Sequence, residues 1–173
     1  YFDVFVEYAK AGPEDLCIRI EAFNRGPEDA DLHLVPHLWF RNTWAWTETP
    51  GPEPGIRPMA QGKDYIGVVA DDRSTDPLKN LQFEYRLGNR YLYGPPGGNL
   101  LFTDNETNGP MVFGPGVASR KPYVKDAFHR YIVNGENCVN PEQVGTKSCM
   151  QYKMRVRAGK SVVLWLRLTP EQM

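Results

Sequence analysis

Apolar and polar side chains alternate along most of this chain, which is the pattern of strands with one buried face. In the stretch 16–24, for example, Leu16, Ile18 and Ile20 alternate with the charged Arg19 and Glu21. The same period predicts strands over 1–9, 16–24, 31–40, 64–70, 81–87, 99–103, 149–156 and 161–168. Pro36 cannot donate to a ladder, so we expect a bulge or an edge position within 31–40.

The connections between these stretches predict the topology. The first three strands are spaced like an antiparallel meander, and the last two read as a hairpin across Arg157–Lys160. The proline-rich stretch 47–62 is longer than most connections and reads as a functional loop or a tolerated insertion. The one helical turn that we expect lies around Tyr123–Phe128. The sequence therefore predicts an all-β fold, an antiparallel β-sandwich of about nine strands, as a single domain over 1–173.

Composition narrows the class of protein. The 173 residues carry a formal net charge of −1, which argues against nucleic acid as a partner. The longest apolar run, Val162–Leu166, is far too short to span a membrane. The chain opens at Tyr1, inside a strand-like stretch, so we expect a piece of a longer protein; a processed mature protein is the alternative.

Cysteines and histidines give no metal framework, and we expect no cofactor. Cys138 and Cys149 flank a turn-rich stretch and could form a disulfide, while Cys17 reads as a half-buried strand residue. An odd number of thiols fits a reducing compartment at least as well as a secretory one. The compartment therefore stays open, with a slight preference for the cytoplasm. Asn105 begins a sequon that would be glycosylated only in a secreted protein.

Three of the four tryptophans fall within one short segment, which makes it the first candidate for a site. Trp44 and Trp46 share strand parity and are expected to project to one face. Aromatic rings beside planar hydrogen-bonding groups suit a sugar, although such rings could equally fill a core or an interdomain contact. The candidate residues here are Trp39, Arg41, Asn42, Trp44 and Trp46.

Two polar clusters are further candidates. Asn105, Glu106 and Asn108 follow an apolar strand and form either a turn held by side-chain bonds or a polar seam with a partner. Lys125, Asp126 and His129 could perform acid–base chemistry, but a loop-borne ion pair explains them as well. No nucleophile motif and no facing pair of carboxylates emerges, so we assign no catalytic residue.

Three long blocks carry a resemblance to a known family: LHLVPHLWFRNTWAW (32–46), LLFTDNETN (100–108) and YVKDAFHRYIV (123–133). With these blocks the chain resembles the amino-terminal part of glycoside hydrolase family 63 proteins, which include α-glucosidases that process mannosyl-oligosaccharides. The resemblance implies a supersandwich, similar to the fold of galactose mutarotase, that precedes an (α/α)6 catalytic barrel. It also implies that this chain lacks the first strands of the sandwich and the barrel that holds the catalytic acids.

The resemblance favours a non-catalytic function. We expect this sandwich to support the carbohydrate cleft of a helical catalytic domain and to be inactive alone. Its partners would be that domain, an oligosaccharide, and a second copy where the apolar contact surface is left uncovered. The alternative is a free-standing carbohydrate-binding module, a lectin, that binds sugar with the segment Trp39–Trp46.

Overall fold

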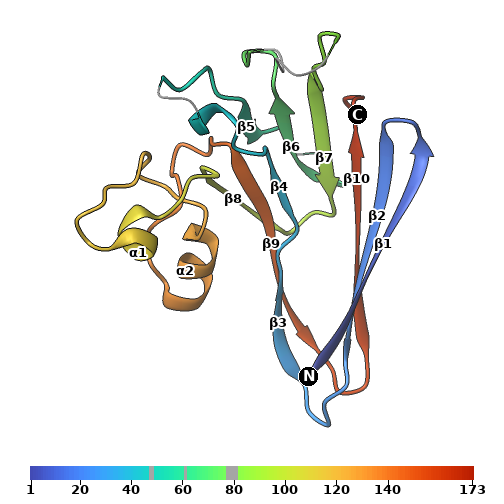
Figure 1. Cartoon of the computed structure of the whole chain (residues 1–173). Helices are drawn as coiled ribbons and strands as arrows, with labels where there is room; N and C mark the ends of the chain where they lie inside the picture. The colour runs from blue at the N-terminus through green and yellow to red at the C-terminus, as the bar shows by residue number, and fades with distance from the viewer. Residues whose placement is uncertain (47–48, 61, 77–81) are drawn as a thin grey trace.

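Two antiparallel sheets pack face to face, which confirms the predicted all-β sandwich (Figure 1). The structure, a computed structural model, describes residues 1–46, 49–60, 62–76 and 82–173. The larger sheet has six strands in the order β1 (Phe2–Gly12), β2 (Asp15–Asn24), β10 (Ser161–Thr169), β7 (Asn89–Gly94), β6 (Ile66–Asp71) and β5 (Gly55–Pro58).

The smaller sheet is built around one strand, β9 (Lys147–Val156). On one side β9 pairs with β3 (Ala30–Leu34) and then β4 (His37–Trp39), and on the other with β8 (Asn99–Thr103). Pro36 separates β3 from β4 at this edge, and its carbonyl accepts a hydrogen bond from the Met150 amide at 3.0 Å. The interruption expected at Pro36 is confirmed.

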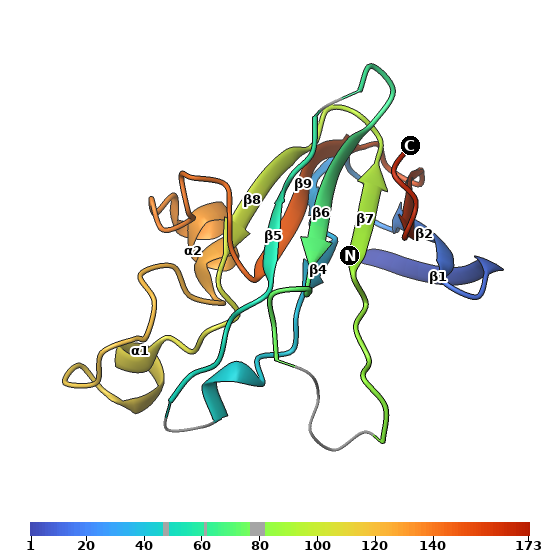
Figure 2. The same cartoon turned by 90° about the horizontal axis from the view of Figure 1, so that it is seen from above.

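Short helices flank the smaller sheet. A 3₁₀ turn, η1 (Trp44–Trp46), follows β4, while α1 (Gly109–Phe113) and α2 (Ala127–Asn134) lie on the side of β8 (Figure 2). Helix α2 starts within the stretch where a helical turn was expected and ends at Gly135, whose φ of 69° is left-handed. Helix α1 was not predicted, because a five-residue apolar segment shows no helical period.

The core lies between the two inner faces. Alternate residues of β2, β6 and β10 meet side chains of β3, β8 and β9. The most deeply buried of these include Ala22, Val68, Leu164, Phe102 and Met150. A separate cluster of Val69, Tyr91 and Tyr93 buries the outer face of β6 and β7.

The predicted meander holds for its first two strands, because β1 pairs with β2 in antiparallel fashion, but it is wrong for the third strand, and the predicted final hairpin is wrong. Strand β3 pairs with β9 and not with β2, and β9 and β10 lie in different sheets. Both connections cross between the sheets at one end of the sandwich, where buried Asn24 donates to the carbonyls of Glu28 (2.8 Å) and Val156 (3.0 Å). Alternation shows that a strand has a buried face, but it cannot show which neighbour it pairs with.

The predicted strand 81–87 is also wrong for its described residues, 82–87, which belong to no sheet. Their alternating aromatics, Phe83 and Tyr85, are exposed. The Asp72 carboxylate accepts from the amides of Leu87 (2.8 Å) and Gly88 (2.7 Å) and so fixes the entry into β7. We did not predict β7, nor β5 within the proline-rich stretch; Thr47, Glu48 and Gln61 of that stretch lie outside the described residues.

Candidate functional site

The loop 104–108, which follows β8, is clamped on one side by the segment after β4. The side-chain amide of Asn105 donates to the Phe40 carbonyl at 2.8 Å, and the Asn42 amide donates to the Asn105 carbonyl at 3.0 Å. The backbone amide of Asn105 donates to the Thr146 hydroxyl at 2.8 Å. The bonds to Phe40 and Asn42 join segments that lie more than sixty residues apart in the sequence, and the bond to Thr146 spans 41 residues.

The other side of the loop is held by the segment before α2. The Asp104 amide donates to the Tyr123 carbonyl at 3.1 Å, and the Lys125 amide donates to the Glu106 carbonyl at 2.9 Å. The Asn108 side chain donates to the Asp126 carboxylate at 2.9 Å. We name the five residues that join these three segments the asparagine seam: Asn42, Asn105, Glu106, Asn108 and Asp126.

Glu106 carries a buried carboxyl in this seam and is only 5% exposed. Its Oε1 lies 3.2 Å from the Arg120 guanidinium, an ion pair that lacks good hydrogen-bond geometry. The same guanidinium lies 3.2 Å from Glu53, and Lys121 lies 3.0 Å from the other oxygen of Glu53. A buried carboxylate needs such a partner, so this cluster fits a structural role.

The three tryptophans are not brought to one face, and the expectation for Trp44 and Trp46 is wrong. The Asn42 carboxamide accepts from the Ala45 amide at 3.2 Å and starts the turn η1, so strand parity does not apply. Trp44 is buried, while Trp46 is 68% exposed with the Arg41 guanidinium 5.3 Å from its ring. Trp39 is also exposed, at the end of β4.

The candidate cluster of Lys125, Asp126 and His129 is only partly brought together in the structure. Asp126 joins the asparagine seam, and the Lys125 ammonium donates to the Thr107 hydroxyl at 3.1 Å. His129 is exposed on α2, and among the described residues no hydrogen bond or ion pair links it to Asp126. Acid–base work by this pair is therefore not supported by the geometry.

The thiols are not crosslinked. All three cysteines are free, so the disulfide considered for Cys138 and Cys149 is absent. The Cys138 thiol donates to the Ala127 carbonyl at 3.3 Å, whereas burial raises the pKa of Cys149 to about 12.

The side-chain nitrogen of Asn105, which a glycan would modify, donates a hydrogen bond to the Phe40 carbonyl, so attachment of a glycan there would break one of the seam's bonds.

Two cavities lie near these residues. One, of about 490 Å³, has charged side chains in its wall and is lined by Glu53, Asp104, Lys121 and Tyr123 among others. Burial raises the pKa of Asp104 above its ordinary value. The other, of about 350 Å³, lies between the two sheets and includes Trp39.

Sequence reasoning missed the ion-pair cluster of Glu53, Arg120 and Lys121. Its acidic and basic members are separated by more than sixty residues and belong to no motif. Across the described part of the chain, no group of three or more His, Cys, Asp or Glu residues could hold a metal ion. The described helices are all too short or too polar to cross a membrane.

Comparison with known proteins gives one informative similarity. No family model matches the chain. A Saccharomyces cerevisiae protein described as "Uncharacterized protein YMR196W" is 31% identical over 193 aligned residues, which cover 98% of this chain and 17% of the yeast protein. The chain thus spans about one sixth of the length of the relative that it matches.

Proposed function

We propose that this sandwich is a non-catalytic module of an α-glucosidase similar to glycoside hydrolase family 63, where it supports the carbohydrate cleft of a helical catalytic domain. The observation that carries this proposal is an apolar surface on α1. Met111, Val112 and Phe113 are consecutive, and their exposed fractions are 76%, 60% and 67%. Contiguous exposed apolar side chains favour a surface that another domain covers.

The asparagine seam supports the same function, because it fixes α1 on the sandwich. The Asn108 carboxamide accepts from the Met111 amide at 3.3 Å, and the Gly109 amide donates to the Ser119 hydroxyl at 2.9 Å. A Cβ on Gly109 would lie 2.8 Å from the carbonyls of Val117 and Ala118, so only glycine fits this close approach. The apolar surface is therefore presented in a defined position.

The test compares the chain with its longer relative. We expect the intact yeast protein to release glucose from α-glucosyl oligosaccharides, and a version without the matched region to lose this activity. The present chain should release none. Glucose release by the chain alone, or no hydrolysis of any α-glucoside by the intact relative, would contradict the proposal.

A second candidate, a free-standing lectin, is favoured by one observation. Trp46 is exposed beside Arg41, and an open ring next to a planar donor suits the stacking of a sugar. Calorimetric titration with glucose- and mannose-containing oligosaccharides separates the two functions. Binding that is lost in Trp46→Ala but kept in Trp165→Ala, a second exposed tryptophan, would support the lectin. The scaffold function predicts no binding in either variant or in the original chain.

A further inference from the structure

The sandwich is closed at one end, and a cavity lies between the sheets toward the opposite end. At the sealed end both crossing connections are tied together, since the Ala158 amide donates to the Asp29 carboxylate at 3.0 Å and the Gly159 amide to the Asn24 carbonyl at 3.1 Å. The cavity of about 350 Å³ lies between the inner faces and falls within the size range of small-molecule sites. Most of its wall is apolar: Leu16, Leu38, Phe40, Ile56, Ala70 and Leu168.

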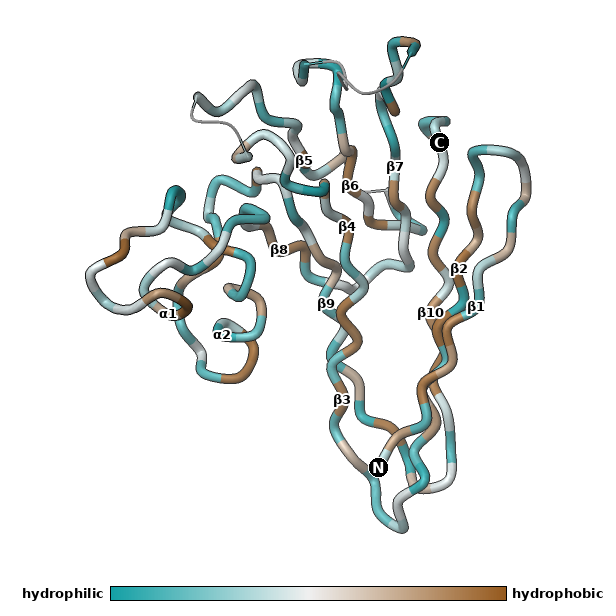
Figure 3. Tube along the Cα trace, in the orientation of Figure 1, coloured by the Kyte–Doolittle hydropathy of each residue, from teal (hydrophilic) through white to brown (hydrophobic). Residues whose placement is uncertain are grey.

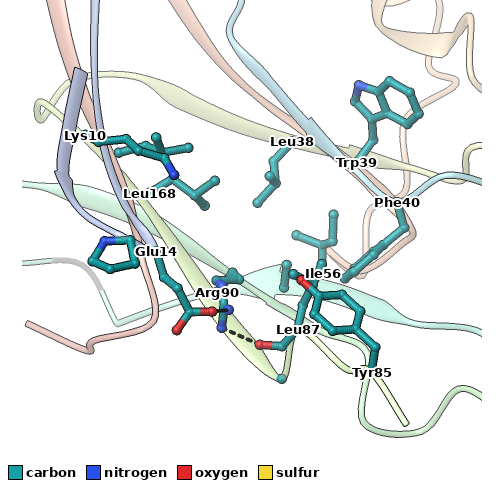
Figure 4. A pocket seen from close by; sticks show the side chains of 14 residues that line it. Lys10, Glu14, Leu38, Trp39, Phe40, Ile56, Tyr85, Leu87, Arg90 and Leu168 are labelled. Carbon is teal, nitrogen blue, oxygen red and sulfur yellow. Dashed lines mark hydrogen bonds and ion pairs between the residues drawn. The ribbon is translucent and has the colours of Figure 1, made fainter. Parts of the chain in front are cut away.

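Cationic groups lie on one side of the cavity. Figure 4 shows Lys10, Glu14 and Arg90 toward one side of the cavity and Trp39, Phe40 and Tyr85 toward the other. The Arg90 guanidinium donates to Glu14 at 2.5 Å and to the Leu87 carbonyl. No ion pair engages Lys10 within the described ranges. The two cations and one carboxylate leave this side with one excess positive charge.

The burial of the Arg90–Glu14 pair is unequal. The side chain of Arg90 is only 15% exposed, whereas that of Glu14 is 60% exposed. The cation is therefore fixed in the wall, while its counter-ion reaches it from solvent. A carboxylate on a ligand could take the place of Glu14 without the protein having to move Arg90. Because Glu14 lies largely in water, its carboxylate stays hydrated when a ligand replaces it at Arg90.

We propose that this cavity binds a small amphipathic carboxylate, with its hydrocarbon body between the sheets and its anionic group at Arg90 and Lys10. Aliphatic walls favour an alkyl or aryl body over a sugar, whose hydroxyls would lose their hydrogen bonds there. The loop that carries Tyr85 and Leu87 forms part of the wall, and Asp72 holds it in place. None of the five residues of the asparagine seam and no residue of α1 lines this cavity, although Phe40 contacts both the cavity and Asn105.

Titration calorimetry with decanoate, below its micellar concentration, tests the proposal. We expect dissociation constants below about 1 mM for decanoate and weaker binding for decanol and decyltrimethylammonium. Lys10→Gln should weaken decanoate binding by about tenfold, the loss of one charged hydrogen bond. Lys160→Gln, in the exposed turn at the sealed end, is the matched control and should bind as the original chain does.

Two further variants distinguish a loss of decanoate binding from a loss of folding. Leu87→Glu places a negative charge at an already exposed position of the wall, and it should abolish decanoate binding while circular dichroism stays unchanged. Glu14→Gln frees Arg90 and should tighten binding by about three- to tenfold, a gain that unfolding cannot produce. No decanoate binding, equal binding of all three decyl compounds, or no effect of Lys10→Gln and Glu14→Gln would overturn the proposal.

Discussion

Strands β6 and β1 belong to the same six-stranded sheet, and both contain several apolar residues (Figure 3). Strand β6 is buried on both faces, whereas most of β1 is exposed. On the inner side of β6, Val68 packs in the main core; on the outer side, Val69 packs with two tyrosines. On β1, Val6 shares the inner side with core-facing Ile20, yet it is 47% exposed.

The difference comes from what covers each strand. The outer face of β6 and β7 is covered by Tyr65 and Met59, and the Tyr93 hydroxyl accepts from the Met173 amide at 2.8 Å at the end of the chain. Strand β1 is the edge of its sheet, beside β2 and farthest along the sheet from β5 and β6 (Figure 1). The same residue type, valine, is thus buried or exposed according to the elements that cover its strand.

Thiol reactivity gives the largest expected contrast between a covered strand and one near the exposed edge. Cys149 lies in β9, 1% exposed, with a pKa raised to about 12 by burial; Cys17 lies half-buried in β2, opposite Ala9 of β1. Because the thiolate is the reactive form, we expect alkylation of Cys149 to be at least about a hundredfold slower than that of Cys17. Mass spectrometry of iodoacetamide-treated Cys138→Ser protein measures both rates. Similar rates would mean that β9 opens as readily as β2.

Matched valine substitutions test the same comparison through stability. Val69→Ala should lower the free energy of unfolding by about 2 kcal/mol, from two lost carbons at about 0.8 kcal/mol each and the cavity left behind. Val6→Ala should lower it by less than about 0.5 kcal/mol, because the side chain is already half in water. Urea unfolding followed by circular dichroism gives both values. Equal losses would show that β1 is covered in solution, for example by a second copy.

Self-association tests whether the exposed strand β1 pairs with a second copy of the chain. Long apolar edge strands pair with other strands unless a charge prevents it, and Val4, Phe5, Val6 and Tyr8 are all exposed on β1. We expect the isolated chain to form dimers, and Val6→Lys to weaken them by about tenfold. Val133→Lys, at a more exposed position on α2, is the control. Sedimentation velocity that shows a monomer at every concentration would contradict this prediction.

The sequence predicted the elements better than their pairing. Alternation located most strands of the core, because one buried face leaves that period whatever the neighbours are, but it missed β7, which contributes Leu92 to the core. It could not reveal that Asn24 anchors a crossing between sheets, since a buried asparagine reads as a turn residue. Nor could alternation find β5, which is short and ends at Pro58.

The same limit applies to the candidate site. The asparagines of the seam were identified from their clustering, but their partners Phe40 and Thr146 are distant in the sequence and contribute only backbone or a single hydroxyl. Trp44 and Trp46 were misplaced, because one carboxamide contact from Asn42 converts the end of a strand into a turn. Local hydrogen bonds of this kind leave no periodic signal.

A second edge strand, β4, shows how partial cover changes ionisation. His37 of β4 is exposed along one side, but its ring packs against Phe128 of α2 with centroids 5.4 Å apart. Burial of the ring, with a smaller contribution from the nearby Lys147 ammonium, lowers the pKa of His37 from 6.5 to about 4. In the unfolded chain the group takes up its proton near pH 6.5, and in the folded chain only near pH 4. The folded state should therefore lose stability as the pH falls from 6.5 towards 4.

Water around the open side of the ring limits this effect to about 1 kcal/mol between pH 7 and pH 5. His37→Gln removes the titrating group and should flatten the dependence over that interval, while His33 and His129 remain in both proteins. Urea unfolding at several pH values measures the slope, and an NMR titration of the His37 ring gives its pKa directly. A titration midpoint of His37 near pH 6.5 would mean that α2 does not cover β4, and β1 and β4 would then be equally exposed to solvent.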